Sequence, residues 1–373
     1  MIRVRGFRWL TLAVSTLLIA GCSNLGYLAQ SVSGHLGVVR AARPVSDWLA
    51  DDQAPEALKQ RLMLTQRMRD FAVRELHLPD NASYRRYADL QRGAAVWNVV
   101  ATAELSLTLK TWCFPVVGCV GYRGYFDRAD ADAEAALLRA QGLEVNVYGV
   151  PAYSTLGKLP GALFADPLLN TFLRYPEGEL ARLIFHELSH QVAYAVDDTV
   201  FNESFATAVE RLGGARWLAE QGGEAARTEY ATFDARRNDF RSLTRQYRVK
   251  LETLFQSAAS DTEKRAGKAA LMAQMRADHQ ALKAGAWAGA GAGAGVGAGV
   301  GAGAGAGVGF AGYDAWFANA NNASLGVMAA YNELVPEFER LFEREGRDFP
   351  RFYAQVQRLA LLPKAQRRAK LKN

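Results

Sequence analysis

The chain has 373 residues, of which 50% are apolar and 22% are charged, and this balance is typical of a globular protein. It excludes a wholly disordered chain, a collagen and a polytopic membrane protein. The formal net charge of +6 comes from 44 basic and 38 acidic residues. Three arginines and no acid lie in the first 21 residues, so the rest of the chain carries 41 − 38 = +3, which is too modest to indicate nucleic-acid binding.

Residues 1–21 are predicted to be a secretory signal peptide. A basic start precedes an apolar run from Trp9 to Ala20, and a run of about 12 residues is too short for a membrane span of ~20. The run ends in Ile19-Ala20-Gly21-Cys22, which resembles a bacterial lipobox. The resemblance implies cleavage before Cys22 and lipid on its thiol and new amino group. Ser23 is not an inner-membrane retention signal, so we expect attachment to the outer membrane, facing the periplasm. An uncleaved N-terminal anchor helix is the alternative.

Cys113 and Cys119 remain as an even pair once Cys22 is lipidated. An exported protein enters an oxidising compartment, and Pro115 and Gly118 allow a tight loop between the two cysteines. We therefore expect a disulfide. The alternatives are a metal pair and two free thiols, although Cys-x5-Cys is not a usual zinc spacing.

The remaining elements are predicted from composition and the spacing of apolar residues. Residues 22–45 lack a sustained period and are expected to be a lipid-anchored tether, followed by one domain at 46–363. Within that domain the pattern predicts a helix over 55–78, a strand or buried helix over 93–109, an ordered loop over 112–126, a helix over 130–140 and a strand over 143–150. Further helices are expected over 176–196 and 202–220, within 224–283, and over 324–360.

Two segments are not expected to join the core. Residues 284–309 alternate Ala or Val with Gly almost perfectly and have little side chain to bury, so we expect a flexible insertion there, with silk-like β stacking as the alternative. Residues 364–373 carry five basic side chains and are expected to be a solvated basic tail, with contact to anionic lipid as the alternative.

The motif that carries chemistry is His186-Glu187-Leu188-Ser189-His190, of the form His-Glu-x-x-His. On a helix His186 and His190 share one face and can bind one metal ion. Glu187 then lies beside a water molecule on that ion and can act as a general base. A hydrolytic zinc site also needs a third protein ligand and an open position. The alternative is two ordinary histidines on a helix.

Glu203 is expected to be the third ligand, because a turn after His190 can fold a second helix back onto the first. Two histidines, one glutamate and Zn²⁺ carry a net charge of +1, which acidifies water at the site. Glu210 lies two turns further along the same helix face and suits a role in orienting a ligand histidine. The other reading of Glu203 is an acid that complements the helix dipole. The competing ligands are Asp197, Asp198 and Glu210.

These motifs, with Asn202-Glu203 followed by Ala206, resemble the gluzincin arrangement of zinc peptidases, at a shorter spacing than in thermolysin-like members. The wider chain resembles a bacterial family of predicted zinc aminopeptidases with lipoprotein signals. The resemblance implies one Zn²⁺, peptidase activity on peptide substrates, and ligands at His186, His190 and Glu203. The matching pieces outside the metal motifs are Trp112–Pro115 with Gly118-Cys119, Tyr122–Phe126, Tyr148–Gly157 and Asn321–Ala323.

The fold is therefore expected to be α+β and mainly helical, a gluzincin-like metallopeptidase with a small sheet from residues 95–110 and 143–157 over the His-Glu-x-x-His helix. Tyr153 is the first candidate for stabilising the oxyanion of the tetrahedral intermediate, before Tyr148 and Tyr331. The expected function is a periplasmic zinc peptidase, an aminopeptidase, in which Glu187 passes a proton from water to the leaving amine. The alternatives are a zinc endopeptidase and an envelope lipoprotein that binds a partner through helices in 224–283, with a structural or vestigial metal site.

Overall fold

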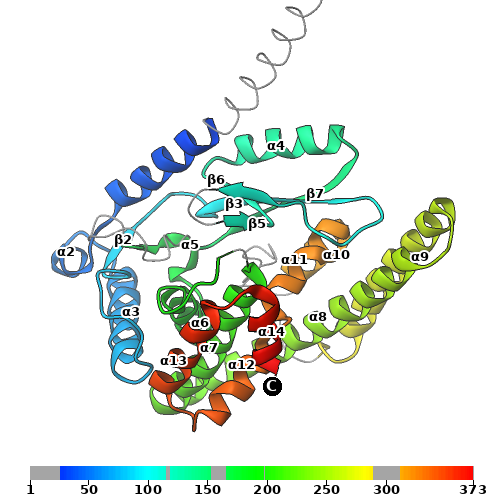
Figure 1. Cartoon of the computed structure of the whole chain (residues 1–373). Helices are drawn as coiled ribbons and strands as arrows, with labels where there is room; N and C mark the ends of the chain where they lie inside the picture. The colour runs from blue at the N-terminus through cyan, green and yellow to red at the C-terminus, as the bar shows by residue number, and fades with distance from the viewer. Residues whose placement is uncertain (1–25, 115–117, 153–164, 197, 289–310, 373) are drawn as a thin grey trace, which may run out of the picture.

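The computed structural model describes residues 26–114, 118–152, 165–196, 198–288 and 311–372. This part of the chain is mainly helical with small sheets, an α+β fold as predicted (Figure 1). Residues 26–41 are helical. The named elements that follow are β1 (Arg43–Pro44), α2 (Val45–Ala50), α3 (Glu56–Arg74), β2 (Arg86–Ala88), β3 (Val96–Ala103), β4 (Trp112–Phe114), β5 (Gly118–Val120), β6 (Arg123–Tyr125), α4 (Arg128–Ala140), β7 (Leu143–Val150), β8 (Leu168–Leu169), α5 (Asn170–Leu173), α6 (Glu177–Ser189), α7 (Thr199–Glu220), α8 (Glu224–Gln256), α9 (Asp261–Ala284), α10 (Ala311–Asn319), α11 (Asn322–Asn332), α12 (Val335–Arg344), α13 (Phe349–Ala360) and α14 (Lys364–Lys372).

The sheet that contains the predicted strand 143–150 has the strand order β6-β3-β7, and both pairings are antiparallel. β3 and β7 pair along their whole length, from Val96 opposite Val150 to Ala103 opposite Leu143. The sheet predicted from 95–110 and 143–157 therefore exists up to residue 150. Residues 153–157 lie outside the described part of the chain.

Different helices cover the two faces of this sheet. Successive side chains of a strand point to opposite faces. Val99 and Ala101 pack with residues of α4, whereas Val100 packs with Ala323 and Val327 of α11. Since α11 also contacts α7, it connects the sheet to the helices drawn below it in Figure 1.

The main core joins α3, α6, α7, α12 and α13 through phenylalanine side chains. The rings of Phe71 and Phe185 lie 6.1 Å apart, and Phe205 lies 5.7 Å from Phe338 and 5.8 Å from Phe352. All five are buried. Burying such a side chain stabilises the fold by about 1.5–3 kcal/mol, so these contacts hold α6 against α3, and α7 against α12 and α13.

The tether predicted for 22–45 is wrong over its described part, because residues 26–41 form a helix that packs on the domain. The Tyr27 ring stacks on Phe114 at 5.3 Å, and the Gln30 side chain donates to the Gly124 carbonyl at 3.1 Å. These partners are about ninety residues away in sequence, so the local pattern does not reveal them.

The solvated basic tail predicted for 364–373 is also wrong, because residues 364–372 form α14. Leu371 is fully buried, and the buried guanidinium of Arg367 donates to Asp198 at 2.8 Å. The packed domain therefore extends beyond the predicted limits of 46 and 363 at both ends.

Several predicted boundaries need correction. The helix expected to run to residue 196 ends at Ser189, and the region 324–360 contains three helices. The region 224–283 is divided into two helices, α8 and α9, and a capping box of Ser260 and Glu263 begins α9. The insertion predicted at 284–309 is described only to residue 288.

The short strands β4 and β5 form a hairpin in the region where an ordered loop was expected. Cys113 lies opposite Cys119 across the two strands, and a disulfide joins them. No helix within the described ranges has both the length and the apolar character needed to cross a membrane.

Candidate metal centre

The His-Glu-x-x-His motif begins in the last turn of α6 and ends at its C-cap residue. Leu180, Leu183 and Ile184 are buried and fix this helix in the core. His190 follows as the C-cap residue with α-helical backbone angles, so it keeps its place one turn after His186. The two imidazoles therefore lie on the same face of the helix.

The next helix, α7, brings Glu203 to the two histidines. Asp198 caps this helix by accepting from the Phe201 backbone N–H at 3.3 Å. Further along α7, a Cβ on Gly213 would lie 3.1 Å from Phe185 of α6, and one on Gly214 would lie 2.6 Å from Arg182 of α6. The two glycines therefore allow α7 to pass close to α6.

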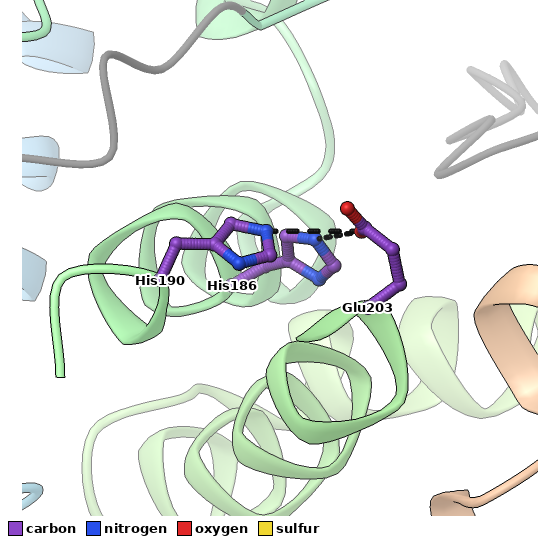
Figure 2. Close-up of side chains that lie close together, drawn as sticks. All are labelled: His186, His190 and Glu203. Atoms are coloured by element: carbon purple, nitrogen blue, oxygen red, sulfur yellow. Dashed lines mark ion pairs between the residues drawn. The ribbon is translucent and has the colours of Figure 1, made fainter. Parts of the chain in front are cut away.

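His186, His190 and Glu203 converge on one point between the helices (Figure 2). The Nε2 atoms of His186 and His190 lie 3.3 and 3.7 Å from Oε2 of Glu203. One ligand atom from each residue lies within 4.8 Å of the others. The three predicted ligands are thus brought together in a geometry that could hold a metal ion.

The other side of His186 is held by a carboxylate. Its Nδ1 lies 2.9 Å from Oε2 of Glu210. Glu210 is the residue that the helix spacing suggested for orienting a ligand histidine. Because a carboxylate only accepts, Nδ1 carries the proton and Nε2 is directed toward Glu203. The buried guanidinium of Arg182 donates to the second oxygen of Glu210.

The charges of the cluster fit a cation. Burial lowers the pKa of His186, but hydrogen bonds to Glu203 and Glu210 and the charge of Glu210 outweigh it and raise that pKa to about 10. Burial lowers the pKa of His190 to about 4, and its Nδ1 is buried without a hydrogen-bond partner in the described structure. Two imidazole nitrogens beside a carboxylate form a donor set that Zn²⁺ commonly takes in catalytic sites, so these residues fit that ion.

Glu187 is the one residue between Gly178 and His190 that is not buried. Burial and the negative charges of Glu203 and Asp166 raise the pKa of Glu187, whereas the positive charge of His186 lowers it. The net result is a pKa of about 7. A half-buried carboxyl group with such a pKa can both accept and release a proton near neutral pH.

Two tyrosines that pack on the α11 face of the sheet lie within range of the charge of Glu203. Burial, partly offset by a hydrogen bond with Asn98, raises the pKa of Tyr148 to about 12, and the charge of Glu203 adds to this shift. Burial and Glu203 also hold the pKa of Tyr122 well above its usual range. Both phenols therefore keep their protons and can act as donors. Tyr153 lies outside the described residues, and the Tyr331 side chain is not among those described.

Two site features escaped the sequence analysis. Tyr122 follows the Cys113–Cys119 hairpin in an aromatic, glycine-rich segment, which is the signal that could have identified it. The Asn202 side chain donates to the carbonyl oxygen of Ala195 at 2.9 Å and accepts from its N–H at 2.7 Å, holding the turn between the helices. The position of Asn202 directly before Glu203 is the feature of the sequence that could have identified it.

Two of the three competing ligand candidates, Asp198 and Glu210, lie in the described part of the chain, and neither takes the place of Glu203 between the two histidines. Asp198 caps α7 and pairs with Arg367 and Arg368, each at 2.8 Å. Glu210 contacts the far nitrogen of His186, and Asp197 lies outside the described residues.

Comparison with known proteins places the chain in a family. No curated protein and no solved structure matched it. A family model with the description "Putative aminopeptidase" matches residues 26–371, which include both ends of the packed domain. The chain therefore belongs to this "Putative aminopeptidase" family, and the membership supports a peptidase function.

Proposed function

We propose that the protein is a zinc-dependent peptidase, and more specifically an aminopeptidase of gluzincin type. His186, His190 and Glu203 would hold the ion. The observation that carries the proposal is the half-buried Glu187 next to these three convergent side chains, on a helix that is otherwise buried there. A site used only to hold structure has no need of such a carboxylate.

When bound, the zinc ion supplies Lewis-acid chemistry that polarises the peptide carbonyl and acidifies water. Glu187 is placed to accept the proton of the attacking water and to return it to the leaving amine. The hydroxyls of Tyr122 and Tyr148 stay protonated within range of the charge of Glu203, and we infer that they donate to negative charge that develops on the carbonyl oxygen. Tyr153, which was predicted from the sequence to stabilise the oxyanion, remains a further candidate for this role.

We also propose that the protein acts in the periplasm, anchored to the outer membrane through lipid on Cys22. The support is the signal-like segment ending in Ile19-Ala20-Gly21-Cys22 and the disulfide between Cys113 and Cys119, which suits an oxidising compartment. Peptides present in that compartment would be the substrates.

The test compares wild type with Glu187→Gln on peptides with free and blocked N-termini. We expect the variant to keep its zinc and to lose about 10²–10⁴-fold in kcat, which is the usual contribution of a general base. An aminopeptidase cleaves only the peptides with a free amine, whereas an endopeptidase cleaves both kinds. Glu177→Gln, the same change at the start of α6, is the control and should retain activity. Wild-type turnover by Glu187→Gln would refute the mechanism.

A further inference from the structure

The helix formed by residues 26–41 has an apolar face exposed to solvent. The side chains of Leu28 and Val32, four residues apart and hence on one face, are 44% and 60% exposed. The chain has no charged residue between Cys22 and Arg40. The solvent face of a helix on a globular protein normally carries charged side chains, so this face differs from an ordinary surface.

The opposite face of the same helix is fixed to the sheet. Tyr27 stacks on Phe114, and the Gln30 side chain donates to the Gly124 carbonyl at 3.1 Å and accepts from the Phe126 N–H at 3.3 Å. The direction in which Leu28 and Val32 point is therefore set by the fold of the domain.

The predicted lipid anchor is very close to this helix in sequence. Only residues 23–25 separate Cys22 from Gly26, and the four steps between them span at most about 14 Å when fully extended. The headgroup region of a bilayer is itself several ångströms thick on each side. A domain attached at Cys22 therefore begins within about 14 Å of its anchor, and the first turn of the helix lies close to the membrane surface.

We propose that the face of the helix around Leu28 and Val32 rests on the bilayer to which Cys22 is anchored. The inference depends on the proposed lipidation but not on the proposed peptidase chemistry. Interfacial helices bind membranes through apolar side chains that enter the headgroup boundary, and such contacts add to the binding that a lipid anchor supplies.

This contact would place the metal centre on the side of the sheet remote from the bilayer. Tyr27 packs with the residues on the α4 face of the sheet. Tyr148 packs with α11 on the other face, and its pKa is raised in part by the charge of Glu203. In Figure 1 the N-terminal helix and α4 lie above α6 and α7. The site would therefore receive peptides from the aqueous compartment rather than from the membrane.

The test uses the full-length lipidated protein in vesicles of phosphatidylethanolamine and phosphatidylglycerol. A nitroxide spin label is attached to Val32→Cys or to the control Val249→Cys, a matched change at a 55% exposed position on α8. With Cys22 lipidated and Cys113 and Cys119 paired, the introduced thiol is the one free to react. The measurement is the ratio of collision rates with oxygen, which concentrates in lipid, and with a water-soluble nickel complex.

We expect the oxygen-to-nickel ratio at position 32 to exceed that at position 249 by several-fold. Equal, water-like ratios at both positions would overturn the proposal, and so would a label at 32 shielded from both reagents, which indicates a protein partner. A chain without lipid on Cys22 would overturn it at its premise. Peptide hydrolysis by the same samples, compared with Glu187→Gln, reports separately on the peptidase.

Discussion

The Nδ1 atom of His186 lies 2.9 Å from Oε2 of Glu210, and both side chains are buried. This contact fixes the proton on Nδ1 and directs Nε2 to the point shared with His190 and Glu203. Arg182, one turn earlier on α6, holds the other oxygen of Glu210. Two residues outside the cluster therefore orient one of its three candidate ligands.

Zinc affinity is predicted to fall by about 10–100-fold in Glu210→Gln and Arg182→Met, because the orientation and basicity of His186 depend on this chain of contacts. The measurement is competition with a chromophoric chelator. Arg237→Met is the control, since Arg237 belongs to the same buried charge network through Glu179 but is bonded to Glu179 and Asp234 rather than to Glu210. Equal losses in Arg182→Met and Arg237→Met would show that general destabilisation, and not orientation of His186, is responsible.

Hydrolysis is predicted to slow in Tyr122→Phe and Tyr148→Phe while zinc content stays unchanged. Removing an oxyanion donor costs about 10²–10³-fold in kcat, and KM should change little. Tyr247→Phe is the control, because that hydroxyl donates to Asp278 in the α8–α9 pair. If neither Tyr122→Phe nor Tyr148→Phe changes kcat, the donor must be another residue, with Tyr153 next to be tested.

The C-terminal helix is predicted to stabilise the start of α7. Arg367→Met would leave Asp198 with one fewer partner in a buried setting, and breaking a buried pair in this way costs about 3–5 kcal/mol in the free energy of unfolding. Arg368→Met removes a more exposed partner of the same carboxylate and should cost about 1 kcal/mol or less. Urea unfolding of the two variants measures the difference, and equal losses would contradict the account.

The same pair predicts a pH dependence of stability. Burial raises the pKa of Asp198, but hydrogen bonds from Arg368 and Arg367 and the charges of Arg368 and Lys364 outweigh it and lower that pKa below its ordinary value. The stabilising contribution is therefore complete above the pKa of the unfolded chain, about 3.9, and is lost as the pH falls below that value. The urea midpoints of wild type and Asp198→Asn should differ most above pH ~4 and converge in stronger acid. A difference that stays constant at low pH would exclude this role.

Much of the site and part of the fold could be predicted because their signals are local. β7 covers the predicted residues Leu143–Val150, since a strand that alternates apolar and polar residues shows its period directly. The convergence of His186, His190 and Glu203 follows from helical spacing and a short turn.

The segments predicted wrongly are ordered by partners far away in sequence. The helix at 26–41 depends on the packing of Tyr27 against Phe114, and α14 depends on the pairing of Arg367 with Asp198. Strands of three residues such as β4, β5 and β6 are too short to show a period. Local patterns therefore could not reveal these parts of the fold.

The central claim is that His186, His190 and Glu203 hold one catalytic zinc ion, and elemental analysis of the purified protein tests it most directly. The account predicts about one zinc per chain in wild type and in the control His77→Ala, whose histidine is exposed, and none in His190→Ala. A well-folded wild-type protein that binds no zinc when zinc is supplied would contradict the account.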